Sequence, residues 1–172
     1  MKVTVHPGRV AGTVSIPGSK SHTIRALLVA SLADGESYIT GALDSQDTAA
    51  CIDVLRKLGV EIQADAQPPR AGGAWEAIAA DGKASDSATG EASGTRSAAP
   101  GTLDLLVRGS SRGFTAPTGT LDCRNSGTTL YLALSLAALH DFPVRFDGDD
   151  QVRRRSAGPL LAALESAGAR VT

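Results

Sequence analysis

The chain has 172 residues, with 17 Lys and Arg against 18 Asp and Glu, and therefore a formal net charge of −1. This balance argues against binding to nucleic acid or to an anionic membrane surface, because either polyanion requires an excess of Lys and Arg. Binding of a small anionic molecule is compatible with this balance, because it needs only a local cluster of cations. Aromatic residues make up 3% of the chain, so the core must be built from aliphatic and small side chains.

Nothing in the sequence marks a membrane-spanning or secreted protein. The longest strongly apolar stretch, residues 130–139, is about half of the roughly 20 residues that cross a bilayer. The start, M-K-V-T-V-H-P-G, lacks the apolar core of a secretion signal. Cys51 and Cys123 have no short spacing and the three histidines no metal-ligand spacing, so we predict no disulfide and no metal site. We therefore expect a cytoplasmic protein.

In chain order, the first block of residues predicts two helices with an apolar face each. These faces are formed by Ile24, Leu27, Leu28 and Leu32 in the first helix and by Ile52, Leu55 and Leu58 in the second. Gly59 ends the second helix, where a C-terminal cap needs a positive φ. Strands are expected before, between and after these helices. They span residues 3–6, 13–16, 37–40 and 60–64.

Residues 66–101 differ in character from the rest of the chain. Of these 36 residues, 26 are Ala, Gly, Ser, Thr or Pro, which leaves too little apolar surface to offset the entropy lost on ordering. We interpret the segment as a flexible insertion, with room for a short strand around Trp75. It separates two predicted units, residues 1–65 and residues 102–172.

The second block resembles the first. Residues 125–139 align with residues 19–33 at an offset of 106, and residues 160–171 align with residues 51–62 at an offset of 109. Two amphipathic helices can match by chance, but the shared order of both matches favours a repeated unit. The helix faces are Leu130, Leu134 and Leu136, then Leu160, Leu161 and Leu164, with Gly168 as the final cap. The strands span residues 103–107, 119–123, 144–147 and 169–172. The pattern is βαβαβ twice, an α/β fold with helices on a sheet.

The segment P-G-S-K-S-H-T-I-R-A-L, residues 17–27, places Lys20 and Ser21 at the opening of a helix. Free backbone N–H groups, hydroxyls and an ammonium at one point favour an anion site, and Arg25 lies on the same side. The alternative is that a serine only caps the helix and that Lys20 is solvated. A nucleotide-binding P-loop is excluded, because it needs glycines where Val14 and Ser19 stand.

A second small polar turn enters the next helix at D-C-R-N-S-G-T-T-L, where Gly127 allows a ligand to approach the backbone. Downstream, the run R-R-R at residues 153–155 is either a solvated surface or a site for an anion.

These motifs, with R-R-R-S-A-G-P-L-L-A-A-L, resemble the amino-terminal part of the 5-enolpyruvylshikimate-3-phosphate synthase family, over both blocks but not the insertion. The resemblance implies an α/β inside-out barrel of six βαβαβ(β) units, of which about two are present. It also implies transfer of the enolpyruvyl group of phosphoenolpyruvate to the 5-hydroxyl of shikimate 3-phosphate, with release of phosphate. The reaction belongs to the shikimate pathway to chorismate and aromatic amino acids, and it uses no metal or organic cofactor.

By position, the resemblance implies that Lys20 contacts both substrates and that Ser21 and Arg25 hold shikimate 3-phosphate. Gly127 lines the phosphoenolpyruvate pocket together with Arg155, whose planar fork suits a phosphate or carboxylate. Four neighbours are further candidates: Asn125, Ser126, Thr128 and Arg153.

Two positions depart from the family pattern. Tyr131 stands where many members have an arginine, and Ser156 where a proline usually follows the arginine. The family's proton-transfer residues fall in segments that this chain does not contain. We therefore expect the isolated chain to be inactive without a C-terminal lobe. The alternative is a non-catalytic anion-binding fragment or a degenerate relative.

Overall fold

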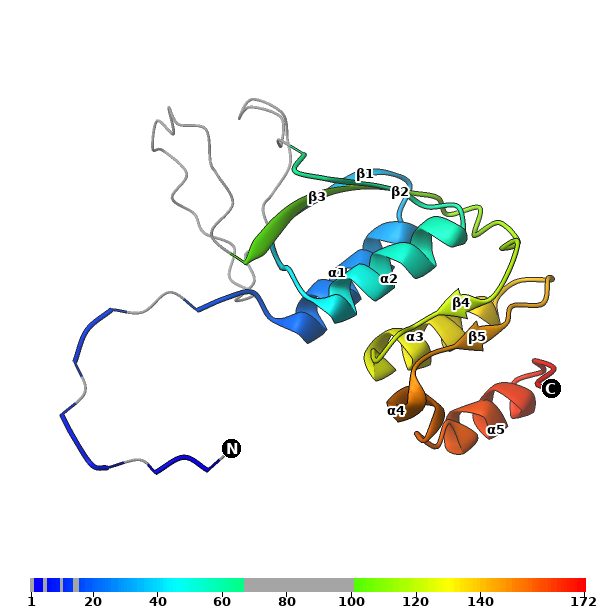
Figure 1. Cartoon of the computed structure of the whole chain (residues 1–172). Coiled ribbons are helices and arrows are strands. Elements are labelled where there is room, and N and C mark those ends of the chain that lie inside the picture. Colours follow the sequence, from blue (N-terminus) through cyan, green and yellow to red (C-terminus); the bar gives the residue numbers. More distant parts are fainter. Residues whose placement is uncertain (1, 5, 10, 14–15, 67–100) are drawn as a thin grey trace.

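The computed structural model describes residues 2–4, 6–9, 11–13, 16–66 and 101–172. In Figure 1 an N-terminal segment runs away from the body, a sheet is covered on one face by two helices, and a smaller, mainly helical part follows. The predicted insertion, apart from its first and last residues, lies outside the described residues, as does the strand expected around Trp75.

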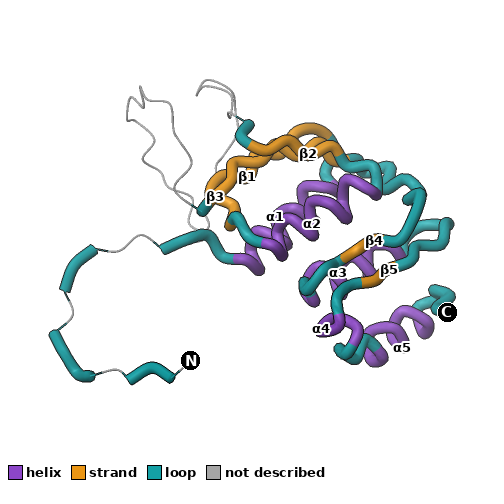
Figure 2. The backbone as a smooth tube through the Cα atoms, in the orientation of Figure 1, coloured by secondary structure: helices purple, strands orange, loops and turns teal. Residues whose placement is uncertain are grey.

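Three strands form the main sheet: β1 (Gly35–Leu43), β2 (Glu61–Ala64) and β3 (Thr102–Gly109). β3 is the central strand and pairs antiparallel with both neighbours. Figure 2 shows the three strands side by side. The strands predicted at residues 37–40, 60–64 and 103–107 are thus confirmed, and the first and third are longer than expected.

β3 follows the insertion in sequence, yet it completes the sheet of the first block. Its Val107 lies opposite Ser37 of β1 and Ile62 of β2. A second unit would therefore begin after β3 and not at residue 102. The division of the chain into units stays a prediction.

Two helices, α1 (Lys20–Leu32) and α2 (Gln46–Lys57), bury the predicted apolar faces against this sheet. Their side chains interlock with those on the inner face of β3 to form the centre of the core. The fully or almost fully buried members include Ile24, Leu27, Val54, Leu55, Leu58, Leu105 and Val107. The positive φ of Gly59, 93°, confirms the predicted cap at the end of α2.

The prediction for Leu32 is wrong, because 36% of this side chain is exposed. Gly109, at the end of β3, packs directly on the backbone of Ala30 and Ser31. Ser31 lies one turn after Leu27 and Leu28 on the buried face of α1, and its hydroxyl donates to the carbonyl oxygen of Leu28 at 2.7 Å. The last turn of α1 therefore points Leu32 toward solvent.

The second part of the structure contains three helices and a small parallel strand pair. These elements are β4 (Leu121–Asp122), α3 (Gly127–Ala137), β5 (Phe146–Asp147), α4 (Asp150–Arg153) and α5 (Gly158–Ser166). α3 packs on α1 and α2, and β4 packs on α2. Leu121, Cys123, Leu130 and Val152 join the same hydrophobic core as the first part, so one core serves both.

Several predicted strands are shorter than expected or do not form. Residues 119–123 and 144–147 reduce to the two-residue strands β4 and β5. Thr13, Ile16 and the described residues of 3–6 have no strand structure, and neither has 169–172. A strand needs a neighbour for its hydrogen bonds, and the described part of the chain offers none to these segments. Residues 5, 14 and 15 lie outside the description.

α5 was predicted with a buried face, but none of its residues is buried. Leu160, Leu161 and Leu164 are only half-buried, because among the described residues little packs over them. Gly168 has the positive φ, 103°, expected of the final cap. Within the described residues, no helix combines the length and the apolar character needed to span a bilayer.

Candidate functional site

The first candidate cluster lies at the N-terminus of α1. The Ser19 hydroxyl accepts a hydrogen bond from the His22 N–H at 3.4 Å and caps the helix. The N–H groups of Lys20 and Ser21 precede the first helical hydrogen bond, so the helix itself does not use them. Gly18 allows the incoming chain to pass against Gly41 of β1, because an added Cβ would collide with the Gly41 carbonyl oxygen.

Lys20 and Arg25 are both held near this N-terminus. Lys20 Nζ lies 3.6 Å from Asp47 Oδ1, at the start of α2, and 47% of the lysine side chain is exposed. Arg25 Nη1 donates to the Ser21 carbonyl oxygen at 3.1 Å, which folds the guanidinium back toward the start of the helix. The structure therefore brings Arg25 to Ser21 and places Lys20 at the same helix start, where its ion-pair partner Asp47 is a neighbour that the sequence did not predict.

The second cluster lies at the N-terminus of α3. Ser126 is fully buried, and its hydroxyl accepts from the Thr129 N–H at 3.3 Å and bonds the Thr129 hydroxyl at 2.8 Å. Because this cap serves the third residue of α3, the N–H groups of Gly127, which is buried, and of Thr128 have no intrahelical partner. Asn125 does not point to this N-terminus, since its Nδ2 donates to Gln151 Oε1 at 3.2 Å.

Arg155 reaches the same N-terminus from the link between α4 and α5. A Cβ added at Gly127 would lie 3.0 Å from Arg155 Cζ and 3.3 Å from its Cδ, and closer still to Nη1. The guanidinium therefore packs directly on the glycine backbone, where any side chain would displace it. An anion at this point would meet a planar cation and the free N–H groups of a helix start.

Arg153, in contrast, is turned away from the second cluster. Its Nε and Nη2 each donate to the Asp147 carboxylate at 2.9 Å. These hydrogen bonds, with one from the Gly148 N–H, lower the pKa of Asp147 to about 2. Of the three arginines in the run, Arg155 supplies the three atoms nearest to a Cβ built at Gly127.

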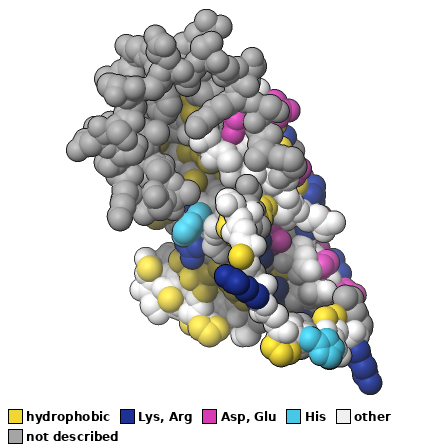
Figure 3. Space-filling model, turned by 90° about the vertical axis from the view of Figure 1, so that its left-hand side faces the viewer, with side chains coloured by type: hydrophobic (Ala, Val, Ile, Leu, Met, Phe, Trp, Pro, Cys, Tyr) yellow, Lys and Arg dark blue, Asp and Glu magenta, His cyan; other side chains and the backbone are white. Residues whose placement is uncertain are grey.

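The N-terminal ends of α1, α2 and α3 point to the same side of the molecule, the left of the view in Figure 1. Their aligned peptide dipoles place partial positive charge on that side. Figure 3 looks at this side, where Lys and Arg side chains lie among hydrophobic ones. α1 packs on α3, but among the described residues no ion pair or hydrogen bond joins the polar groups of the two clusters.

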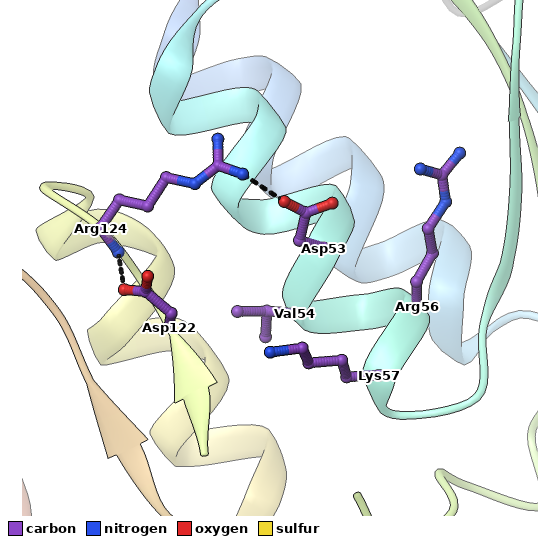
Figure 4. Close-up of a pocket in the computed structure, with 6 residues that line it drawn as sticks. All are labelled: Asp53, Val54, Arg56, Lys57, Asp122 and Arg124. Carbon is purple, nitrogen blue, oxygen red and sulfur yellow. Dashed lines mark hydrogen bonds and ion pairs between the residues drawn. The ribbon is translucent and has the colours of Figure 1, made fainter. Parts of the chain in front are cut away.

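A pocket between α2 and β4 contains none of the predicted site residues. Figure 4 shows its lining, Asp53, Val54, Arg56, Lys57, Asp122 and Arg124. Its cations already have protein partners: Arg124 pairs with Asp53, Lys57 donates to the Thr120 carbonyl oxygen at 3.2 Å, and Arg56 to that of Ile62 at 2.6 Å. The pocket is therefore a polar seam between the two parts of the structure.

Comparison with known proteins supports the resemblance noted in the sequence. The profile of the EPSP synthase (3-phosphoshikimate 1-carboxyvinyltransferase) family matches residues 5–95 and 101–172. The 3-phosphoshikimate 1-carboxyvinyltransferase of Acetivibrio thermocellus is 35% identical over 169 residues, which cover 98% of this chain and 31% of that protein. The 3-phosphoshikimate 1-carboxyvinyltransferase of Mycobacterium ulcerans is 37% identical over 166 residues, which cover 94% of this chain and 30% of that protein.

The fold agrees with solved structures. EPSP synthase from Acinetobacter baumannii superposes with a TM-score of 0.67 over 92% of this chain and 28% of that one, at 22% sequence identity. The chain thus spans about 30% of the length of the curated relatives that it matches. With a mixed α/β fold, both motif-bearing helix starts and a profile match over most of its length, the chain belongs to the EPSP synthase family.

Proposed function

We propose that this chain forms the amino-terminal part of a cytoplasmic 3-phosphoshikimate 1-carboxyvinyltransferase. Its two parts would then correspond to about two of the six βαβαβ(β) units of an inside-out barrel. The observation that carries the proposal is the packing of the Arg155 guanidinium on Gly127 at the start of α3. The two residues are far apart in sequence, and their contact builds a cationic face on a helix N-terminus that has free N–H groups.

Each cluster would bind one part of the substrates. Lys20, Ser21 and Arg25 would hold shikimate 3-phosphate, and Lys20 would also reach phosphoenolpyruvate. Gly127 and Arg155 would bind the phosphate or carboxylate of phosphoenolpyruvate, because a guanidinium fork and two N–H groups match such an anion. Asp47 would act as the counter-ion of Lys20 until an anionic substrate replaces it.

In the reaction, the 5-hydroxyl oxygen of shikimate 3-phosphate loses its proton and forms a bond to C2 of phosphoenolpyruvate, while C3 gains a proton and the C2=C3 double bond becomes single. The resulting tetrahedral adduct then loses a proton from C3 and phosphate from C2, which restores the double bond. The residues of this chain would orient the two polyanions and reduce their mutual repulsion. Groups that move protons would come from a C-terminal lobe, as would the rest of the cleft. We therefore expect no phosphate release by the 172-residue chain alone with both substrates.

An NMR titration of the ¹⁵N-labelled chain with shikimate 3-phosphate tests the binding role. We expect saturable shifts of the Lys20 and Arg25 amides, which disappear in Lys20→Ala. Lys57→Ala is the matched control, because Lys57 is an equally long cation at the far end of α2. Equal shifts in both variants would place the binding elsewhere. An absence of shifts in the wild type would favour a degenerate relative that has lost substrate binding.

A further inference from the structure

We propose that Tyr131 is a positioning residue for Arg155: its hydroxyl holds the link between α4 and α5 so that the guanidinium stays over the N-terminus of α3. The inference rests on the proposed function, since the orientation of Arg155 matters there for binding of phosphoenolpyruvate. Nothing in the family resemblance assigns a role to a tyrosine at this position.

Two contacts at consecutive residues of the link support this role. Gly127 and Tyr131 lie one turn apart on the same face of α3. Gly127 contacts the side chain of Arg155, and the Tyr131 hydroxyl donates to the Ser156 carbonyl oxygen at 3.4 Å. One face of α3 therefore holds the arginine side chain at its first turn and the adjacent peptide at its second.

The link itself has few other restraints. The N–H of Arg155 bonds the Val152 carbonyl oxygen at 3.0 Å, and that of Arg154 bonds Asp150 at 3.3 Å, both within the same short segment. Ala157, at the start of α5, makes no side-chain cap. Among the described residues, the Tyr131 hydroxyl is the one hydrogen-bonding group from outside α4 and α5 that reaches residues 154–157.

Tyr131 can position the link between α4 and α5, but it cannot supply a positive charge. Its ring is half-buried and packs on the hydrophobic core, so the hydroxyl starts from a fixed point. A phenol carries no positive charge, and the Tyr131 hydroxyl already donates to the Ser156 carbonyl oxygen, so its effect on an anion would act through Arg155. Holding the link in place lowers the conformational entropy that the arginine would otherwise lose when an anion binds.

The first test needs no ligand. In Tyr131→Phe the ring packing is kept and only the hydroxyl is removed. We expect the ¹H–¹⁵N heteronuclear NOE of the Arg155 Nε–H group to fall in this variant. Tyr38→Phe is the matched control, because this tyrosine lies on β1 and its hydroxyl contacts Glu36. The proposal would be overturned if the heteronuclear NOE of the Arg155 Nε–H group were the same in Tyr131→Phe as in the wild type and the control.

The second test measures binding of phosphoenolpyruvate in the presence of shikimate 3-phosphate. We expect the dissociation constant of phosphoenolpyruvate to rise about threefold to tenfold in Tyr131→Phe, as for the loss of one hydrogen bond. The shifts that shikimate 3-phosphate causes at Lys20 should be unchanged in this variant. A general loss of structure would alter them. An unchanged dissociation constant would overturn the proposal. If the wild type binds neither substrate, the proposed function fails, and the NOE of Arg155 still decides the role of Tyr131.

Discussion

The Asp147 carboxylate accepts hydrogen bonds from the Arg153 guanidinium and from the Gly148 N–H. Its pKa falls from 3.8 to about 2. Since the folded-state pKa is below the unfolded one, this stabilisation is present above about pH 3.8 and is lost as the pH falls through 2. In Asp147→Asn, the free energy of unfolding should therefore depend less on pH between these values. Urea unfolding of the variant and the wild type at several pH values measures this pH dependence.

Asp141→Asn is the control, because this exposed aspartate makes no such pair with an arginine among the described contacts. If Asp147→Asn and the wild type lose stability in parallel from pH 3.8 to pH 2, the hydrogen bonds of Arg153 do not act on this carboxyl group.

The two cysteines are buried in the core, and burial raises the pKa of each thiol to about 12. The thiolate is the reactive form, so native Cys51 and Cys123 should stay unmodified by iodoacetamide at pH 8 for as long as the chain is folded. In guanidinium chloride both should react within minutes, as mass spectrometry would show. Stoichiometric modification of the native chain would contradict their burial.

Single residues also show what a motif can and cannot predict. The sequence places Lys20 and Gly127 at helix starts, because small polar residues before an apolar helical pattern mark an N-terminus. The structure confirms both positions. The sequence does not reveal that Lys20 faces Asp47 or that Arg153 faces Asp147, because these partners depend on how separate elements pack. The assignment of substrates to these residues stays a prediction.

At the scale of elements, the turn after α2 fixes the direction of the chain. Gly59 has a φ of 93°, and an added Cβ would lie 3.2 Å from Thr115 Cγ2 and closer to its Oγ1. The Thr115 N–H also donates to the Leu58 carbonyl oxygen at 2.8 Å. Gly59→Ala should combine backbone strain with a collision and lower the free energy of unfolding by about 2–4 kcal/mol.

Gly168→Ala separates these two effects. Gly168 also has a positive φ, 103°, but an added Cβ there meets nothing within 4 Å. We expect a loss of about 1–2 kcal/mol from strain alone. Equal losses in the two variants, measured by chemical denaturation, would show that the contact with Thr115 is unimportant.

Helices were easier to predict than strands because their signal is local. The apolar spacing of α1, α2 and α3 and the glycines after α2 and α5 are all visible within one segment. A strand depends on a partner that lies elsewhere in the chain. The alternating residues 3–6 and 13–16 fit a strand equally well, but the described residues offer them no neighbour. α4 was missed because four residues are too few to show a period.

At the scale of the whole molecule, one hydrophobic core joins the two parts. Leu121 of β4 is fully buried in this core, whereas the ion pair of Asp53 with Arg124 is about half exposed on both sides. Leu121→Ala should therefore lower the free energy of unfolding by about 2–5 kcal/mol. Asp53→Ala, which removes the ion pair, should cost less than about 1 kcal/mol.

Both variants are compared by urea denaturation followed through far-UV circular dichroism and through amide signals of each part. In Leu121→Ala the signals of β1 and of α3 should disappear together, at a lower urea concentration than in the wild type. Separate midpoints for the two parts would show that the shared core does not couple them.

The order of the main sheet, β1–β3–β2, also has a consequence for biosynthesis. β3 is the last of the three strands to leave the ribosome, although it lies in the middle. β1 and β2 have hydrogen-bond partners only in β3 within the described sheet, so a nascent chain that ends before residue 102 lacks the native partner of both strands. The residues between β2 and β3 must be synthesised before β3, which imposes a waiting time. During that time α1 and α2 have no complete sheet to cover, and their apolar faces are open to chaperones.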